Sequence, residues 1–392
     1  YFVPGGYMRD TVLVDGVFYV VGQGFLRLMQ MLVVPLVFCS LICGSAAIGD
    51  TKTLGKVGVK TIVFYLFTTA LAISIALAVG TIVKPGLGLD TAAIQTQDVT
   101  VAESTTLTET LLNIIPTNPI GALANGTMLQ VIVFALFVGI ILAKLGERVE
   151  VVSNFFAQFN DIMMEMTNMV MMAAPIGVYC LIARTFSNIG FSGFIPMAKY
   201  MLCVLGALAI HCLGSYSALM AIFTRLNPYR FIRKYFPVMS FAFSTATSNA
   251  TIPMAIETLD EKIGVSKKIS SFTIPLGATI NMDGTAIMQG VAVCFAAQAF
   301  GITLTPTDYL TVIATATLAS IGTAGVPSVG LITLSMVFAS VGLPVEAIAM
   351  IMGIDRILDM ARTMVNITGD AMCTVIVANQ DGALNRDVFN SK

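Results

Sequence analysis

Residues 244–253 read Ser244-Thr245-Ala246-Thr247-Ser248-Asn249-Ala250-Thr251-Ile252-Pro253, a run of small polar residues at the centre of the apolar stretch Phe231–Ile256. Basic residues occur at both ends of that stretch, namely Arg225, Arg230, Arg233, Lys234, Lys262, Lys267 and Lys268. Because Lys and Arg mark the cytoplasmic ends of membrane segments, both ends are expected on the same side. The pattern predicts a re-entrant hairpin, called hairpin 1 below.

The composition agrees with a protein embedded in lipid. Of the 392 residues, 56% are hydrophobic and only 11% are charged, whereas about 25% are charged in an ordinary soluble domain. So few charges could not cover the surface of a soluble protein of this size. We therefore predict a polytopic, all-α membrane protein in the cell membrane. The composition argues against a soluble enzyme, a nucleic-acid-binding protein and a disordered chain.

Apolar stretches long enough to cross a bilayer occur along the whole chain, since about 20 apolar residues suffice. The expected spans are Val17–Ile48, Val57–Val83, Met128–Leu145, Phe155–Ala183, Phe194–Phe223, Ile269–Phe300 and the more charged Pro344–Ala378. The basic loops between them are expected in the cytoplasm, and residues 85–125, which lack Lys and Arg, outside.

A second interrupted stretch, Tyr309–Val341, is predicted to form hairpin 2. Its centre contains three glycines and a proline, Gly322, Gly325, Pro327 and Gly330. The flanking residues 301–308 and 342–346 carry no Lys or Arg, so this hairpin should enter from the outside. Two opposed hairpins form an inverted repeat, which is typical of secondary transporters that bind their substrate at mid-membrane.

Polar residues also interrupt two of the predicted spans. Within Ile269–Phe300 lies Asn281-Met282-Asp283-Gly284-Thr285, where a glycine after an aspartate can unwind a helix and expose oxygen ligands suited to Na⁺. In the last span, residues at steps of three and four share one broad face: Asp355, Asp359, Arg362, Asn366 and Asp370. Charges inside a membrane are costly and mark function, with structural ion pairs as the alternative.

The charges of this predicted core do not balance. Four aspartates, at 283, 355, 359 and 370, are accompanied by two arginines, at 356 and 362, which leaves an excess of two negative charges. An acidic amino acid would add another, so we expect bound cations to offset them. The one histidine, His211, lies in an apolar stretch and is expected to be a packed or cavity-lining residue rather than a ligand.

At these residues the chain resembles the glutamate transporter family, the dicarboxylate/amino acid:cation symporters. The specific motifs are Asn281–Thr285, Asp359-x-x-Arg362-Thr363-x-x-Asn366-x-x-x-Asp370 and Gly322-Thr323-Ala324-Gly325-Val326-Pro327. The resemblance covers nearly the whole chain from the first span onward, and the family's first helix would precede Tyr1. It implies a homotrimer in which each subunit's transport domain crosses the membrane like an elevator.

The resemblance also implies roles for individual residues. Arg362 would hold the side-chain carboxylate of the substrate, Asp359 its amino group, and Asn366 with the backbone around Ser248 its α-carboxylate. The remaining residues that would line the substrate site are Asn249, Thr285, Val326, Gly330 and Thr363. One Na⁺ would bind Gly277, Asn281, Asn366 and Asp370. A second would bind Thr279, Ser320, Ile321 and Thr323, and a third Tyr65, Thr68, Thr69, Asn281 and Asp283.

The chain departs from the family pattern near the tip of hairpin 1. Ala246 stands where the archaeal-type transporters have Arg, and Met360 where the animal glutamate transporters have one. Arg356 lies one turn before Met360 and could supply that charge. The absence of Arg at position 360 puts any K⁺ countertransport in doubt. Asn249 stands where a Ser is usual, which could alter the α-carboxylate site.

The resemblance divides the chain into regions. Residues 1–150 would be mainly scaffold and trimerisation helices, although the span at 57–83 would belong to the transport domain. Residues 151–228 would mix scaffold and transport helices, and residues 229–392 would form the transport core with both hairpins.

Na⁺-coupled uptake of aspartate or glutamate is the leading hypothesis. A neutral amino-acid exchanger would be expected to lose the Arg362 charge, and a C4-dicarboxylate carrier would not need Asp359 for an amino group. Both remain alternatives of the same fold. An anion channel lined by the hairpins is the alternative from another class. An intramembrane hydrolase is weaker, because Ser244 and Ser248 have no paired histidine.

Overall fold

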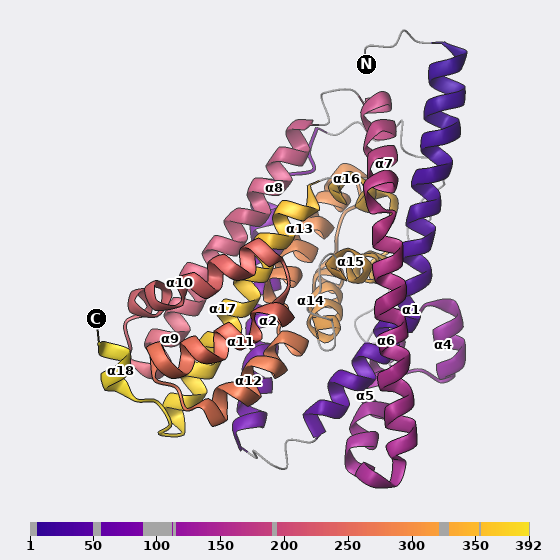
Figure 1. The fold of residues 1–392 in the computed structure, drawn as a ribbon. Coiled ribbons are helices and arrows are strands. Elements are labelled where there is room, and N and C mark those ends of the chain that lie inside the picture. The colour runs from indigo at the N-terminus through magenta and orange to yellow at the C-terminus, as the bar shows by residue number, and fades with distance from the viewer. Residues whose placement is uncertain are drawn as a thin grey trace.

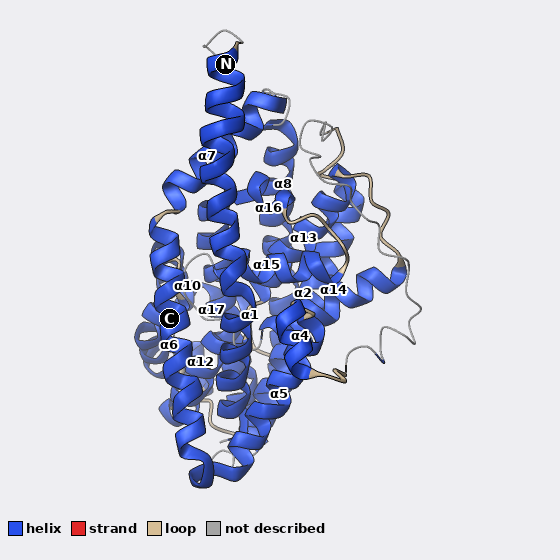
Figure 2. Cartoon of the chain, turned by 90° about the vertical axis from the view of Figure 1, so that its right-hand side faces the viewer, coloured by secondary structure: helices blue, strands red, loops and turns tan. Residues whose placement is uncertain are grey.

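The computed structural model describes residues 6–49, 56–88, 112, 115–189, 194–320, 329–352 and 354–391. Within these ranges every regular element is helical, apart from an isolated bridge between Val265 and Leu384 (Figure 2). Three helical stretches of the described residues have the length and hydropathy needed to cross a membrane: Val57–Val83, Ile195–Thr224 and Lys267–Ala299. The described part of the chain is thus all-α, as its composition predicts.

One group of helices is built around α1 (Tyr19–Gly49), which continues the π-helix η1 (Met8–Phe18). It packs against α5 (Met128–Leu145), α6 (Glu150–Met172) and α7 (Ala174–Ile189), and the short α4 (Pro119–Asn125) packs on α5. These helices lie side by side on one flank of the molecule (Figure 1).

The other group surrounds α13 (Asp283–Ala299), whose residues are buried except for Gln298. It includes α2 (Lys56–Val83), α8 (Phe194–Ala209), α14 (Pro306–Ser320), α15 (Val329–Ser340) and α17 (Asp355–Gln380), all of which contact α13. Gly290 of α13 faces Ala76 and Ile73 of α2 at a distance that leaves no room for a side chain. Small residues therefore bring α2 and α13 together, as in other closely packed membrane helices.

Hairpin 1 forms the helix–turn–helix that its polar run predicts. Helix α10 (Pro228–Thr245) ends at Ala246, α11 (Ser248–Thr258) begins two residues later, and the two helices pack against each other and against α17. Ala246 adopts a left-handed conformation (φ 51°), which is costly for a residue with a Cβ, and its amide caps α10 by donating to Ala242 O. In hairpin 2, α14 and α15 flank residues that lie outside the described ranges.

Three predicted spans are divided where the sequence pattern suggested one helix. Phe155–Ala183 is broken between α6 and α7, just before Pro175, which lacks the amide donor that a continuous helix needs. Pro344–Ala378 is divided into α16 (Glu346–Met352) and α17. Ile269–Phe300 is divided into α12 (Lys267–Ile280) and α13, and the break lies at Asn281 and Met282 rather than at Gly284 as expected.

The span Phe194–Phe223 is a continuous rod with an irregular centre. Helix α8 passes into the π-helical turn η5 (Ile210–Ser215) and then into α9 (Tyr216–Thr224). The wider turn of a π-helix shifts the residues that it presents, and such turns occur often at functional sites. Here it contains His211, which is completely buried.

The last residues, 381–391, form a segment that we call the C-terminal clasp. It contains α18 (Arg386–Asn390) and joins the base of hairpin 1. The Lys234 ammonium of α10 donates to Val388 O (2.7 Å), to Lys262 O (2.9 Å) and to Ser391 Oγ (3.2 Å). Asn385 N donates to Gly264 O, which follows the π-helical turn η6 (Leu259–Ile263). The clasp therefore connects both ends of hairpin 1 to the end of α17.

Phe389 is the apolar anchor of the clasp, because it is fully buried. We expect Phe389→Ala to lower the free energy of unfolding by about 3 kcal/mol through the cavity that it leaves. The thermal midpoint of the purified protein in detergent would measure this loss. Tyr229→Ala, at an aromatic residue that is 71% exposed, serves as the control and should leave the midpoint unchanged. Equal midpoints for both variants would contradict the anchoring role.

Candidate functional site

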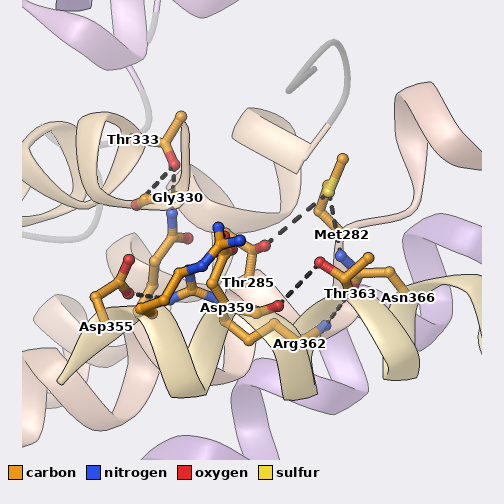
Figure 3. A network of polar contacts seen from close by, with 12 residues as sticks. Met282, Thr285, Gly330, Thr333, Asp355, Asp359, Arg362, Thr363 and Asn366 are labelled. Carbon is orange, nitrogen blue, oxygen red and sulfur yellow. Dashed lines mark hydrogen bonds and ion pairs between the residues drawn. The ribbon is translucent and has the colours of Figure 1, made fainter. Parts of the chain in front are cut away.

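Among the lysines and arginines of the described chain, Arg362 of α17 is the most deeply buried, with a side chain that is 1% exposed. Its Nη1 donates to Asp355 Oδ1 (2.7 Å) and its Nη2 to Asp359 Oδ1 (2.8 Å). The three residues share one face of α17, as their spacing predicts, and Figure 3 shows them together. The Nε of Arg362 has no hydrogen-bond partner among the described residues, so one N–H remains for a ligand.

Arg356 contributes a second positive charge at the edge of this cluster. Its side chain is 61% exposed, and its Nη1 lies 4.0 Å from Asp359 Oδ2, the oxygen that Arg362 does not contact. Two aspartates and two arginines therefore balance within one cluster. Arg356 stands beside Asp359 as the sequence suggested, whereas Ala246 of the hairpin tip brings no charge.

Other predicted substrate residues converge on Arg362 from α13 and α15. A Cβ at Gly330 would lie 3.0 Å from Thr285 Cγ2 and 3.6 Å from Arg362 Cζ, so the start of α15 lies directly against the guanidinium. Thr363 Oγ1 donates to Asp359 O (2.9 Å), which keeps that hydroxyl on the same turn of α17.

Asn366 of α17 forms hydrogen bonds with residues at the break between α12 and α13. Gly284 N donates to Asn366 Oδ1 (2.7 Å), and Asn366 Nδ2 donates to Met282 Sδ (3.3 Å). Ser248 is buried at the start of α11, whereas Asn249 beside it is exposed. The structure thus brings Thr285, Gly330, Asp359, Arg362, Thr363 and Asn366 to one region, and α11 packs against α17 beside it.

A second cluster surrounds Asp370, which is fully buried. Asn281 Nδ2 donates to Asp370 Oδ1 (2.8 Å), but Asp370 Oδ2 and Asn281 Oδ1 have no hydrogen-bond donor among the described residues. Position 277 needs a glycine here, because a Cβ on this residue would overlap the Asp370 carboxylate and the Tyr65 hydroxyl. Buried oxygens without donors are costly unless a cation or water satisfies them.

The carboxylate of Asp283 is enclosed differently. Thr69 Oγ1 donates to Oδ1 (2.6 Å), Tyr216 OH donates to Oδ2 (2.6 Å), and His211 Nε2 lies 3.2 Å from Oδ2. All four residues are fully buried. His211 is therefore packed inside the protein, as expected, and its ring lies 4.4 Å from that of Tyr216.

The structure describes only some of the remaining residues that were predicted to bind cations. Tyr65 OH donates to Thr273 O of α12 (3.1 Å), whereas Thr68 Oγ1 donates to Tyr65 O (3.1 Å) within α2 itself. Ser320 is buried at the end of α14 and donates to Thr317 O. Ile321, Thr323, Val326 and the side chain of Thr279 lie outside the described part of the chain.

Sequence reasoning missed Tyr216, Gln289 and Thr333 as polar residues beside these clusters. Tyr216 bonds Asp283, and Gln289 Nε2 donates to Thr333 Oγ1 (2.8 Å) behind Gly330. A signal existed for Gln289, which is an amide within an apolar helix. A cavity of about 610 Å³ lies elsewhere, among Cys43 of α1, Phe156 of α6 and Glu147, which precedes α6, and none of the predicted site residues is among the described residues that line it.

The chain is similar to known transport proteins over most of its length. A model of the sodium:dicarboxylate symporter family matches residues 11–380. The chain is 35% identical to the proton/sodium-glutamate symport protein of Bacillus caldotenax, over 94% of this chain and 88% of that protein. It is 36% identical to the proton/glutamate-aspartate symporter of Escherichia coli, over 93% and 85%, and 36% identical to the bovine neutral amino acid transporter B(0), over 89% and 71%.

The contact at Gly277 yields a prediction about cation binding. Gly277→Ala should displace Asp370 and cost about 1–3 kcal/mol of stability. We expect Na⁺ to raise the thermal midpoint of the wild type by binding the folded protein, and this rise should be absent in the variant.

Gly206→Ala is the matched control, because Gly206 lies in helix α8 and a Cβ there would meet nothing within 4 Å. Thermal unfolding of both variants with Na⁺ or with choline as the replacement cation measures the effect. An undiminished Na⁺-dependent shift in Gly277→Ala would argue against a cation at this position.

Proposed function

The chain belongs to the sodium:dicarboxylate symporter family, and from this premise we propose that it couples inward Na⁺ movement to the uptake of aspartate or glutamate. The family consists of transporters rather than enzymes. Two of the relatives named above are symporters of glutamate or of glutamate and aspartate. The observation that carries the proposal is the buried Arg362, held by two carboxylates with one N–H left for a ligand.

Substrate recognition would use opposite charges on one face of α17. The planar guanidinium of Arg362 suits a carboxylate, and Asp359 suits an ammonium group. These groups contact each other without substrate (2.8 Å), so a zwitterion with a side-chain carboxylate could replace that contact by one at each end. Asn366 and the start of α11 at Ser248 would hold the α-carboxylate. Asn249, Thr285, Val326, Gly330 and Thr363 would line the site.

This charge pattern favours an acidic amino acid over the other substrates. A neutral amino acid would leave the Arg362 charge without a ligand in a buried site, and a C4-dicarboxylate would leave Asp359 without an ammonium partner. The bovine relative is named a neutral amino acid transporter, so the same fold accepts both classes. The retained arginine is the reason to prefer the acidic class here.

Na⁺ coupling is supported by the location of the excess negative charge. The cluster of Asp355, Arg356, Asp359 and Arg362 is balanced, whereas Asp283 and Asp370 contact no Lys or Arg within the described residues. Asp370 Oδ2 and Asn281 Oδ1 have no hydrogen-bond donor among the described residues and would bind a cation, with Gly277 and Asn366 as the other proposed ligands. Among hard cations, Na⁺ is the one that this family's description names.

Two further Na⁺ sites complete the proposal. One would use Ser320 at the end of α14, together with Thr279, Ile321 and Thr323. The other would use Tyr65, Thr68, Thr69, Asn281 and Asp283. At that third site the cation would replace the Thr69 proton beside Asp283 Oδ1, with the Thr69 oxygen as a ligand, because Oδ2 already faces Tyr216 and His211.

The two groups of helices support an elevator in a homotrimer. The scaffold would comprise α1 and α4–α7, and the transport domain α2 and α8–α17, so residues 57–83 would join the transport domain although they precede most of the scaffold. Large apolar side chains such as Phe137, Ile140 and Ile141 are exposed on α5, as expected for a surface that faces lipid or another subunit. The basic loops would lie in the cytoplasm.

Uptake into proteoliposomes tests the substrate class. The wild-type chain should take up aspartate saturably and only with an inward Na⁺ gradient, whereas a channel would show Na⁺-independent conductance without saturation. Arg362→Ala should weaken aspartate binding about a hundredfold or more, since truncating one partner of a buried charge pair costs about 2–5 kcal/mol. Binding of a neutral amino acid such as serine should persist in part.

The matched control is Arg184→Ala, which removes another mostly buried arginine that contacts Asp15 and Tyr19 of the other helix group. Aspartate affinity should be unchanged there. Unchanged aspartate affinity in Arg362→Ala would contradict the proposed substrate assignment.

A Na⁺ titration tests the cation site at Asp370. Asp370→Asn removes the charge and keeps the shape, so we expect the Na⁺ concentration for half-maximal uptake to rise about tenfold or more. Glu261→Gln removes an exposed negative charge from η6 and serves as the control. A titration curve in Asp370→Asn that coincides with the wild type would count against this site.

A further inference from the structure

A buried hydrogen-bonded chain links α13 to the first turn of α15. Gln289 Nε2 donates to Thr333 Oγ1 (2.8 Å), and Thr333 Oγ1 donates to Gly330 O (3.1 Å). Gln289 is 2% exposed and Thr333 is 3% exposed. Resting on the proposed function, we infer that Gln289 and Thr333 are positioning residues that set the selectivity between aspartate and glutamate, by holding Gly330 against Arg362.

The link matters because of what Gly330 touches. Its missing Cβ would lie 3.0 Å from Thr285 Cγ2, 3.3 Å from Met288 Cε and 3.6 Å from Arg362 Cζ. The first turn of α15 is therefore the wall of the site that faces the guanidinium. A displacement of this turn changes the space in which the side-chain carboxylate of the substrate meets Arg362.

The other contacts of α15 do not specify its position in the same way. Its buried residues are otherwise apolar, among them Leu331, Ile332 and Leu334, and apolar contacts have no directional preference. The hydroxyls of Ser335 and Ser340 donate to carbonyls of α15 itself, at Ile332 and Val337. Among the described hydrogen bonds of α15 side chains, only the one at Thr333 reaches another helix.

Gln289 is a suitable anchor because α13 is the central helix of its group. The residues around it are buried, and Gly290 next to it packs closely against α2. The amide is thus held in place, and a satisfied polar link in a low-dielectric interior resists rearrangement more than apolar packing does. Losing Thr333 removes the acceptor of the buried Gln289 amide, and losing Gln289 removes the bond from Thr333 to α13, so either loss favours movement of α15.

Aspartate and glutamate differ by one methylene group. A well-shaped site discriminates such a difference by about ten- to two-hundredfold, and discrimination of this kind depends on the position of the wall. Loosening the first turn of α15 should therefore reduce the preference for one acid over the other as well as the affinity. The role is one of positioning, because neither side chain needs to contact the substrate.

The test compares the kinetics of aspartate and glutamate uptake in proteoliposomes. Gln289→Leu and Thr333→Val each remove the link and nearly keep the side-chain volume. Each should raise the KM of the preferred acid about tenfold, while kcat stays within about twofold, and the ratio of the two kcat/KM values should fall by a similar factor. The double variant should be no worse than either single variant, because both break the same link.

Two variants separate positioning from general damage. Thr333→Ser keeps the hydroxyl and should restore the wild-type KM and selectivity. Ser335→Ala removes a hydroxyl of α15 that bonds only its own helix, and it should behave as the wild type. If Gln289→Leu does not fold, as its thermal midpoint would show, Thr333→Val and Thr333→Ser still decide the question.

The failure of this inference differs from the failure of the proposed function. A wild-type chain that transports neither acid overturns both. A wild-type chain that transports them, with an unchanged KM and acid preference in Thr333→Val, overturns the positioning role alone. An equal loss in Ser335→Ala, or additive losses in the double variant, would also overturn it.

Discussion

A guanidinium buried at the centre of an apolar helix bundle must be balanced by negative charge within hydrogen-bond distance. Arg362 meets this requirement with Asp355 and Asp359 on the same face of α17. The start of α15 and Thr285 of α13 then complete the surroundings of the guanidinium. Much of the architecture can be understood from this requirement, because α13, α15 and α17 all converge where that charge is held.

The same electrostatic reasoning separates two kinds of acidic residue in this core. Asp355 and Asp359 have arginine partners, and their charges are cancelled inside the protein. Asp283 and Asp370 are surrounded by hydroxyl, amide and imidazole groups, which hydrogen-bond a carboxylate without neutralising it unless the imidazole is protonated. A buried carboxylate of this second kind is stable when a cation or a proton joins it. The division explains why a transporter of anionic substrates can carry an excess of acidic residues.

The sequence predicted much of this arrangement and missed specific parts for physical reasons. Periodicity along α17 placed Asp355, Asp359 and Arg362 on one face, because a regular helix repeats every 3.6 residues. The polar run of hairpin 1 likewise located the break between α10 and α11. The break between α12 and α13 was expected at Gly284, but the structure has it at Asn281 and Met282, where bonds from the distant Asn366 hold the chain open.

Residues that act across helices were the hardest to find. Nothing in the local sequence of α9 indicates that Tyr216 bonds Asp283, because the two residues are 67 positions apart and lie on different helices. Gln289 and Thr333 are 44 positions apart and meet only because α13 and α15 pack together. The family resemblance implied roles for motifs such as Asn281–Thr285, but it indicated no hydrogen-bond partner for Tyr216, Gln289 or Thr333.

The C-terminal clasp connects the base of hairpin 1 to the end of α17, through hydrogen bonds on one side and the covalent chain on the other. Lys234 joins the first leg of the hairpin to the clasp, Gly264 joins the second leg, and the chain itself returns through α17. Because both legs of hairpin 1 contact the clasp at their base, the two legs are held together there. The base of hairpin 1 is therefore joined to the end of the same helix that carries Asp359 and Arg362.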